Sequence, residues 1–423
     1  MDKQIQKTGI ARSQNVPQVR FPEFNDDWEV KRLGGIGEIN PKSDDLPSEF
    51  IYIDLESVKK GILLKETKVS KKSAPSRAQR LLLKNDILFQ MVRPYQKNNF
   101  FFNRENNRYV SSTGYAQIRT NEDSRYLYFY LHTSKFVNDV LTRCTGTSYP
   151  AINSNDLSKI PITFPQLPEQ KKIAHFFSVV DKKLNQLQEK LNGLELYKKE
   201  MMQQIFSQQL RFKDNTSTAL STGNGQDFPN WEVKKLGNYI EVISGFAFKG
   251  DDISEDKNGI PLLRGINITE GHIRHSKQID RFYNGKYETL EKYFLQENDL
   301  VIGMDGSKVG KNVSLITKKD VNSLLIQRVA RLRSNGKSNI NFVFQIIFSI
   351  WFIRYVDIVN TSSGIPHISL KQINDFSFNF PSLKEQTEIA NFLSKIDEKI
   401  NAVNTQIETT KTYKKGLLQK MFV

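Results

Sequence analysis

The sequence of 423 residues contains a single cysteine, Cys144, and this scarcity sets the first limits on the protein. One thiol cannot form an internal disulfide or supply a cysteine-rich zinc site, so a reducing cytoplasm is the expected compartment. Long apolar runs are also missing, since no stretch approaches the roughly 20 residues that a membrane-spanning helix needs. The polar segment from Met1 to Val19 has no apolar core of the kind found in signal peptides. We therefore expect no membrane partner and no secretion.

Signatures of catalysis are missing as well. There is no Asn-Pro-Pro-Tyr-type tetrapeptide for amino methylation, and no Ser/His/Asp or paired-carboxylate arrangement stands out. The segment GSKVGKN from Gly306 is not a P-loop, because no glycine stands five residues before Gly310 and Asn312 replaces the Ser or Thr. A turn and a phosphate-touching loop both fit it. His272 and His275 have the spacing of metal ligands on a helix but lie in a strand-like region, which favours exposed or DNA-facing side chains over zinc. We expect no chemistry and no bound cofactor or metal.

What the sequence has in excess is positive charge. It holds 61 Lys and Arg against 46 Asp and Glu, a formal net charge of +15, which favours nucleic acid or an acidic membrane surface as partner. Residues 70–119 hold ten Lys and Arg against two acidic residues, and residues 300–334 hold seven against two. Because these two stretches occupy matching places in a repeat, DNA is the partner we expect.

That repeat is the strongest pattern in the chain. The matching pairs are FPEFNDDWEVKRL (21–33) with FPNWEVKKL (228–236), NDIL (85–88) with NDLV (298–301), and FPQLPEQKKIAHFF (164–177) with FPSLKEQTEIANFL (380–393). The last pair aligns at an offset of 216, which also relates Asp181 to Asp397 and Lys198 to Lys414. Each copy therefore has a divergent body followed by a well-matched closing segment.

The closing segments are predicted to be long helices. From Ile173 and again from Ile389, apolar residues recur at alternating steps of four and three, the 3.5-residue period of a coiled coil. Both copies interrupt this period at the same place, with Lys198 and Lys414. Packing of each helix on its own body is one interpretation. Pairing of the two helices with each other, in antiparallel directions, is the one we favour, and it would relate the bodies by a pseudo-two-fold axis.

Each body reads as a mixed α/β domain, with short strand-like runs such as FIYIDL and DLVIGM before helical stretches at 125–141 and 341–359. The overall prediction is an α+β chain with two similar recognition domains separated by two long antiparallel coiled-coil helices. The expected segments are a flexible tail (1–20), domain 1 (21–165), a central helix (166–212), a linker rich in Ser, Thr, Gly and Asn (213–227), domain 2 (228–381) and a C-terminal helix (382–423).

With these features, the chain resembles the specificity subunit of type I restriction-modification systems over residues 21–423. The resemblance rests on the W-E-V-K-x-L entry at Trp28 and Trp231, the NDIL/NDLV turn, and a Pro-x-Ile (150–152 and 366–368) followed by Phe-Pro-x-L-x-E-Q-x-x-I-A. It implies that each body is a target recognition domain for one half of a bipartite double-stranded DNA target. It also implies two modification subunits that methylate adenine with S-adenosylmethionine, and restriction subunits that use ATP and Mg²⁺.

Candidate DNA contacts are basic, polar and aromatic side chains of the loops, which are the residue types that reach phosphates and base edges. Those nominated are Arg77, Arg80, Arg93, Tyr95, Lys97, Asn98, Arg104, Ser148, Tyr149, Lys249, Arg264, Ser307, Lys308, Lys311, Asn312 and His367. A structural role stays equally open for His367. The copies differ after the NDIL/NDLV strand, where MVRPYQKNN in the first stands against a glycine-containing loop in the second.

Three other classes remain as alternatives. A stand-alone DNA-binding regulator built from the same modules is the main one. An enzyme with unrecognised catalysis lacks cofactor motifs, and a coiled-coil scaffold without a nucleic-acid role leaves both basic stretches unexplained.

Overall fold

The computed structural model describes residues 15–43, 45–105, 108–212, 220–222, 228–360 and 365–423. The chain forms two compact units, and each is described by itself: unit 1 holds Met1–Glu189 with Thr405–Val423, and unit 2 holds Lys190–Asn404. Most of the predicted tail (1–20) and of the predicted linker (213–227) lies outside the described residues.

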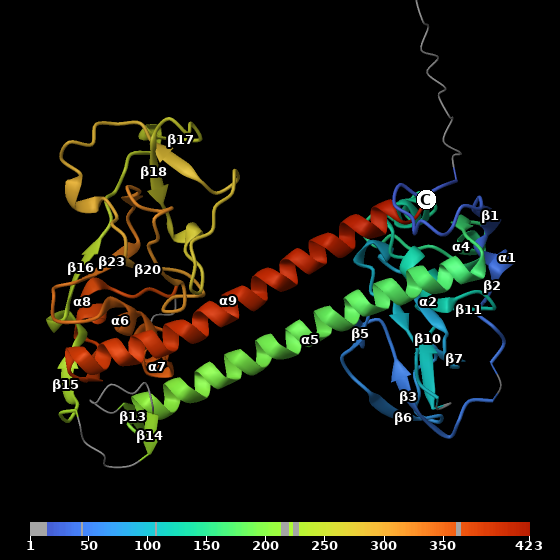
Figure 1. Ribbon diagram of the computed structural model, residues 1–423, viewed down its shortest axis with the longest axis horizontal. Helices are drawn as coiled ribbons and strands as arrows, with labels where there is room; N and C mark the ends of the chain where they lie inside the picture. The colour runs from blue at the N-terminus through green and yellow to red at the C-terminus, as the bar shows by residue number, and fades with distance from the viewer. Residues whose placement is uncertain (1–14, 44, 106–107, 213–219, 223–227, 361–364) are drawn as a thin grey trace, which may run out of the picture. The chain divides into compact units, whose positions relative to one another are not determined.

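Unit 1 contains a body with two four-stranded sheets, ordered β2-β11-β8-β9 and β6-β3-β10-β7, and the small pairs β1-β12 and β4-β5 (Figure 1). Its elements are β1 Glu29–Arg32, α1 Leu33–Ile36, β2 Gly37–Ile39, β3 Glu49–Ile53, β4 Val58–Lys59, β5 Ile62–Leu63, β6 Thr67–Ser70, β7 Ala78–Leu81, β8 Ile87–Gln90, η1 Pro94–Gln96, β9 Phe100–Phe101, β10 Tyr109–Ser112, β11 Tyr115–Thr120, α2 Ser124–Tyr130, α3 Ser134–Leu141, α4 Ser154–Ser158 and β12 Pro161–Phe164.

Unit 2 repeats this plan with sheets β16-β23-β20-β21 and β17-β19-β18-β22 and the pairs β15-β24 and β13-β14. Its elements are β13 Leu210–Phe212, β14 Leu220–Thr222, β15 Glu232–Lys235, η2 Leu236–Asn238, β16 Ile240–Ser244, η3 Gly250–Asp252, β17 Ile253–Ser254, β18 Ile260–Leu263, η4 Gly265–Asn267, β19 Arg281–Tyr283, η5 Glu291–Tyr293, β20 Leu300–Gly303, β21 Val313–Leu315, β22 Leu324–Leu325, β23 Val329–Ser334, α6 Ile340–Ile347, α7 Ile350–Val359, α8 Leu370–Asp375 and β24 Ser377–Phe380.

The apolar runs of the NDIL and NDLV motifs form strands buried on both faces. In β8, Ile87 faces the core beneath the helices while Leu88 faces a second core beneath the other sheet. In β20, Leu300 and Val301 divide in the same way. Successive side chains of a strand point to opposite faces, so a strand between two cores must be apolar throughout. The same central strand therefore anchors both bodies.

A buried aspartate and a left-handed asparagine explain the polar half of these motifs. Asn85 and Asn298 have φ values of 72° and 70°, a conformation that asparagine tolerates better than most residues. The next residue, Asp86 or Asp299, is buried and accepts two hydrogen bonds from one guanidinium, at 2.8 and 2.9 Å from Arg119 and at 2.6 and 2.7 Å from Arg333. The motif is thus a structural turn that enters the central strand.

A buried glutamate of the exit motif is paired with an arginine in each unit, and in unit 2 it also binds the entry motif. In unit 1, Glu169 accepts two hydrogen bonds of 2.8 Å from Arg20. In unit 2, Glu385 accepts bonds of 3.0 and 2.8 Å from Arg211 and one of 2.9 Å from the indole of Trp231. Since charges this deep in a fold are stable only when paired, each exit-motif glutamate and the arginine that binds it form one structural unit.

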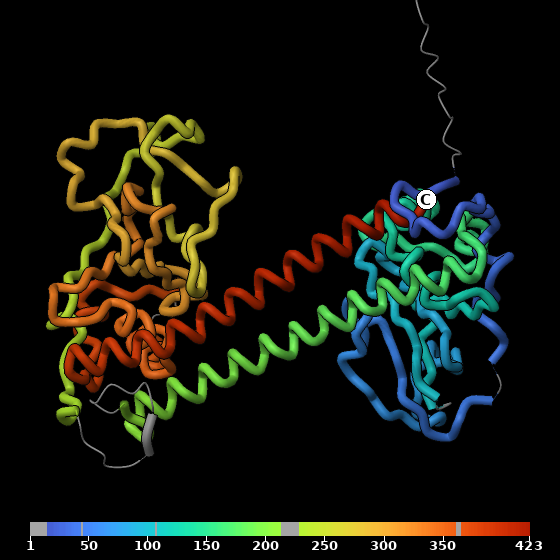
Figure 2. The backbone as a smooth tube through the Cα atoms, in the orientation of Figure 1, coloured from blue at the N-terminus to red at the C-terminus, as the bar shows by residue number. Residues whose placement is uncertain are grey.

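The two long helices are confirmed: α5 covers Leu167–Phe206 and α9 covers Leu383–Lys420. Their ends meet in antiparallel fashion within each unit. In unit 1, Ile173 and Phe177 of α5 share a core cluster with Met421 and Phe422 beyond the end of α9. Figure 2 shows this red end of the chain beside the blue and green first body.

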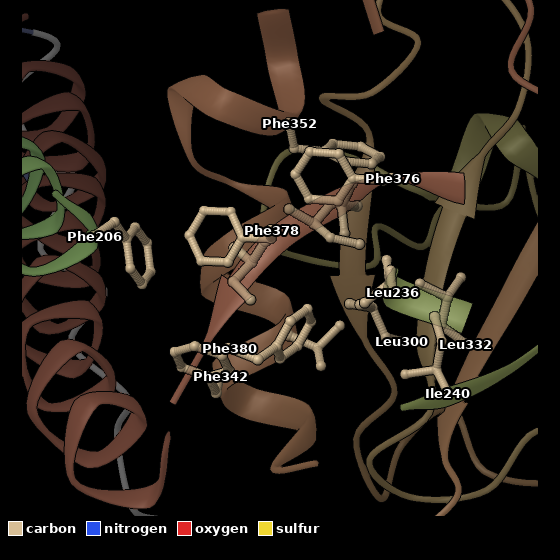
Figure 3. Packing of buried hydrophobic residues seen from close by; sticks show 14 of the residues in the cluster. Phe206, Leu236, Ile240, Leu300, Leu332, Phe342, Phe352, Phe376, Phe378 and Phe380 are labelled. Carbon is tan, nitrogen blue, oxygen red and sulfur yellow. The ribbon is translucent and has the colours of Figure 1, made fainter. Parts of the chain in front are cut away.

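In unit 2 the end of α5 packs beside the start of α9 on the second body. Phe206 lies against Phe378 of β24 with ring centroids 5.4 Å apart (Figure 3). Phe422 is the repeat equivalent of Phe206 and lies 5.3 Å from Tyr126 in unit 1. The sequence left open whether each helix packs on a body or pairs with the other helix. Each unit shows both, because the helix ends in it contact the body and also one another.

The lysines that interrupt the apolar period pair with aspartates of the other helix. Lys414 Nζ lies 2.5 Å from Asp181 Oδ1 in unit 1, and Lys198 Nζ lies 2.6 Å from Asp397 Oδ1 in unit 2. Both ion pairs therefore fix the register of the antiparallel ends.

Among the described residues, no single helix is long and apolar enough to span a membrane. Helices α6 and α7, which are bent by 60° at their junction, reach that length and apolarity only when taken together. Within unit 2, both helices contribute buried side chains to the main core cluster, including Phe342 and Phe352.

Candidate nucleic-acid interface

The loop after the central strand and the Pro-x-Ile segment are bonded together in both units by equivalent backbone contacts. In unit 1, Arg93 N donates to Pro150 O at 2.7 Å and Ile152 N to Met91 O at 3.1 Å. In unit 2, Gly306 N donates to Pro366 O at 3.0 Å and Ile368 N to Met304 O at 2.9 Å. Two motifs about 60 residues apart in each copy thus build one surface. The nominated residues of both motifs lie on it.

In unit 1 this surface presents an arginine stacked on a tyrosine. The Arg93 guanidinium lies 4.0 Å from the ring centroid of Tyr149, whose side chain is 65% exposed. Arg93 has a φ of 53°, in the left-handed region that costs free energy for any residue except glycine. Tyr95, in the 3₁₀ turn η1, and Ser148 are also exposed. These four nominated residues come from the two bonded segments.

Lys97 and Asn98 use their side chains inside the unit. Lys97 Nζ donates to His132 O at 2.7 Å, and Asn98 Oδ1 accepts from the backbone N–H of Lys60 at 2.9 Å. Burial, with a smaller effect of Lys415, lowers the pKa of Lys97. Burial also lowers the pKa of His132 to about 4, so its ring is neutral at pH 7. Both nominated side chains hold the loop in shape, and their contact with DNA stays a prediction.

The other nominated residues of unit 1 belong to the second sheet and its neighbours. Arg77 is exposed just before β7, and Arg80 lies on β7 itself, where burial lowers its pKa. Arg104 Nη2 lies 2.7 Å from Glu66 Oε1, and its guanidinium lies 5.0 Å from the ring centroid of Tyr109. No contact that the structure records brings these three arginines to the Arg93 loop.

In unit 2 the equivalent surface contains a hollow with a carboxylate at its edge. Asp305 Oδ1 lies 2.5 Å from His367 Nδ1, and Asp305 Oδ2 lies 3.0 Å from Arg328 Nη1. The hollow has a volume of about 360 Å³ and is lined by Arg264, Gly265, Ile266, Gly303, Asp305, Asn312, Ile326, Gln327 and Arg328. The structure therefore brings together Arg264, Asn312 and His367, three of the nominated residues.

Asp305, Gln327 and Arg328 are not among the residues nominated from the sequence, although Asp305 and Arg328 belong to the charged stretch 300–334. The feature that singles out Arg328 is its φ of 66°, which no sequence pattern reports. Its side chain is 72% exposed.

The glycine-containing loop of unit 2 is a series of turns. Gly306 and Gly310 have φ values of 96° and 76°, and a Cβ atom on Gly310 would approach Val356 to 2.9 Å. Ser307, Lys308 and Lys311 are exposed on this loop, and Lys308 Nζ lies 3.0 Å from Glu270 Oε1. The turn interpretation of GSKVGKN is thus confirmed, while contact with phosphate stays a prediction.

Lys249 and His275 make no recorded contact with this loop. Lys249 is exposed at the start of η3. His275 bridges Asp280 and Asp320, with nitrogen–oxygen distances of 3.2 and 2.9 Å. Burial opposes protonation of His275, but hydrogen bonds with Asp320 and Asp280 outweigh it and raise its pKa. Within the described ranges, no cluster of three His, Cys, Asp or Glu side chains is placed to hold a metal ion.

Several basic residues counted in the charged stretches are structural. Arg119 and Arg333 are the partners of Asp86 and Asp299. Arg331 is nearly inaccessible, with Nη2 3.1 Å from Glu241 Oε1, and burial, with a smaller effect of Arg333, lowers its pKa. The surface that remains for a polyanion is therefore less basic than the sequence count indicates.

Comparison with known proteins gives consistent matches along the whole chain. A family model described as the type I restriction modification DNA specificity domain matches residues 25–196 and again 229–410. The MjaVIII specificity subunit of Methanocaldococcus jannaschii, a type I restriction enzyme subunit, is 25% identical over 95% of this chain and 92% of its own length. The EcoAI specificity subunit of Escherichia coli is 34% identical over 44% of this chain and 31% of its own.

Among solved structures, the type I restriction-modification S subunit from M. genitalium has a TM-score of 0.62 at 14% identity. The match covers 96% of this chain and 99% of that one. A chain from a type I restriction-modification assembly has a TM-score of 0.54 at 19% identity, with 93% and 97% covered. These likenesses support the fold.

Proposed function

Because the chain belongs to the family of type I restriction modification DNA specificity domains, we propose that it recognises a bipartite DNA target, with one half-site for each body. Family membership makes DNA sequence recognition its general role. The observation that carries the finer proposal is a backbone arrangement present twice with different side chains on it. Arg93 and Tyr149 stand on one copy, while Asp305, His367 and Arg328 stand on the other. Two half-sites of different sequence require the same backbone framework with different side chains at the base edges.

The two long helices set the gap between the half-sites in this proposal. The 40 residues of α5 give a rod of about 60 Å, and insertions within it would lengthen the unread segment of DNA.

Two modification subunits dock on the chain and methylate adenine with S-adenosylmethionine, while restriction subunits supply ATP- and Mg²⁺-dependent cleavage. Exposed apolar side chains that recur at the 216-residue offset support two equivalent docking sites. Leu167 and Leu383 are 37% and 48% exposed, and Tyr197 and Tyr413 are 44% and 54% exposed. Because these apolar side chains are exposed at equivalent positions of both repeats, they are candidates for contact with a partner that binds in two copies.

The test is co-expression of the full chain with its modification subunit, followed by mapping of methylated adenines across the host genome. We expect a bipartite motif with a fixed gap that disappears when the chain is omitted. A stable complex that binds DNA but leaves adenines unmethylated would contradict the proposal and favour a stand-alone DNA-binding regulator.

A further inference from the structure

Each body places one arginine in a left-handed backbone conformation beside its Pro-x-Ile segment, but from a different position. In unit 1 it is Arg93, with φ 53°, two residues after Met91. In unit 2 it is Arg328, with φ 66°, just before β23. Asparagine tolerates this conformation in structural turns, but for a long side chain such as arginine it is uncommon, and such strained residues cluster at binding sites.

Arg328 occupies the position that Gly114 occupies in unit 1. Met304 N donates to Arg328 O at 2.9 Å, and the matching bond of unit 1 runs from Met91 N to Gly114 O at 3.1 Å. Unit 1 therefore builds the same backbone contact with a glycine. Gly114 has a φ outside the left-handed region, so the arginine of unit 2 adds both an exposed guanidinium and a strained backbone angle that unit 1 lacks at this position.

Neighbouring side chains hold each guanidinium in one orientation. Tyr149 stacks on Arg93 at 4.0 Å, and Asp305 pairs with Arg328 at 3.0 Å while His367 holds Asp305. Binding sites that read a planar ligand depend on such supporting groups. The hollow beside Arg328 also contains Asn312 and Gln327, whose amides match adenine as the arginine fork matches guanine.

We propose that Arg93 and Arg328 are specificity-determining residues, each reading a guanine in the half-site of its own body. This inference rests on the proposed function. A phosphate contact fits Arg328 less well, because the carboxylate of Asp305 offsets the charge that a phosphate would attract. A guanine needs the two parallel N–H groups of the fork and only a modest net charge.

The experiment uses the full chain with its modification subunit and compares methylated motifs. Arg328→Lys keeps the charge but loses the fork, so one guanine position of one half-site should become degenerate, with discrimination falling roughly 5- to 150-fold. Arg93→Lys should do the same in the other half-site. The gap and the untouched half should stay as in the wild type. Arg354→Lys, on α7 and outside the hollow, is the matched control with an unchanged motif.

A second pair of variants separates recognition from folding. Arg328→Gly removes the strain and should leave the melting temperature equal or higher while relaxing the same position of the motif. Asp305→Asn should relax that position less, because the fork is present but less well held. An unchanged motif in both Arg→Lys variants would overturn the inference while leaving the proposed function standing. Absence of any bipartite motif with the wild-type chain would remove the proposed function and this inference with it.

Discussion

Removal of the buried aspartate that starts each central strand should destabilise its own unit. Asp299 is 1% exposed and holds Arg333 through two bonds, of 2.6 and 2.7 Å, and the backbone N–H of Gln296 at 2.7 Å. Asp299→Ala leaves that N–H and a guanidinium without their acceptor. Breaking a fully buried pair costs about 3–5 kcal/mol; since the Arg333 side chain is 29% exposed, we expect about 2–3 kcal/mol.

The repeat supplies an internal comparison for this prediction. Asp86 holds Arg119 and the N–H of Leu83 in the same way, and also accepts from Gln117 Nε2 at 2.7 Å. One further lost hydrogen bond adds about 1 kcal/mol, so Asp86→Ala should destabilise unit 1 more than Asp299→Ala destabilises unit 2.

Native-state hydrogen exchange of the strand amides measures the opening free energy of each unit separately. Asp299→Ala should accelerate exchange in β20, and Asp86→Ala should accelerate it in β8. Asp375→Ala breaks an exposed ion pair with Lys235 in unit 2 and serves as the control, with a much smaller expected loss of stability because solvent screens the pair. A loss in Asp299→Ala no larger than that of the control would refute the reasoning, as would equal effects in both units.

Three other measurements follow from the structure and the proposed function. Lys308→Ala with Lys311→Ala should weaken DNA binding and lower the slope of log affinity against log salt by about 1.8, the value for two lost phosphate contacts; an unchanged slope would take both lysines out of the interface. Insertion of seven residues, two helical turns, within 185–195 should lengthen the unread gap and leave both half-sites intact, and an altered half-site sequence would contradict the spacer role. The half-buried ring of His132, with a pKa of about 4 against 6.5 for the free group, should contribute stability that is present above pH 6.5 and is lost as pH falls from 6.5 to 4, by about 3 kcal/mol in unit 1. His132→Asn should flatten the acid limb of a denaturation profile, and a profile identical to the wild type would show that His132 does not titrate on unfolding.

The repeat, the two long helices and the α+β character of the bodies could all be predicted from the sequence, because each is a local or periodic property. The 3.5-residue apolar period from Ile173 and Ile389 determines a helix with one apolar stripe wherever it packs. The NDIL and NDLV runs determine a turn followed by a strand buried on both faces. The lysines that interrupt both stripes were visible as a pattern, but their partners, Asp181 and Asp397, are more than 190 residues away along the chain.

The candidate site was only partly predictable, since the sequence reports charge and not which charges are already paired. Lys97 was nominated for its place in a basic loop, but its ammonium group binds the backbone of His132. Arg119 was counted among the basic residues although Asp86 holds it. A paired cation is indistinguishable from a free one in a composition, because pairing depends on contacts between distant segments.

The sequence by itself determined which elements form and that they form twice, since hydrophobic period, turn residues and motif order act over short stretches of chain. Only the tertiary structure decided which side chains share a surface. It brought His367 to Asp305 across 62 positions and gave Arg328 the position that Gly114 holds in the first body. The physical reason is that a strained backbone angle and a long-range ion pair have no local signature. Both exist only once the surrounding fold holds the residues in place.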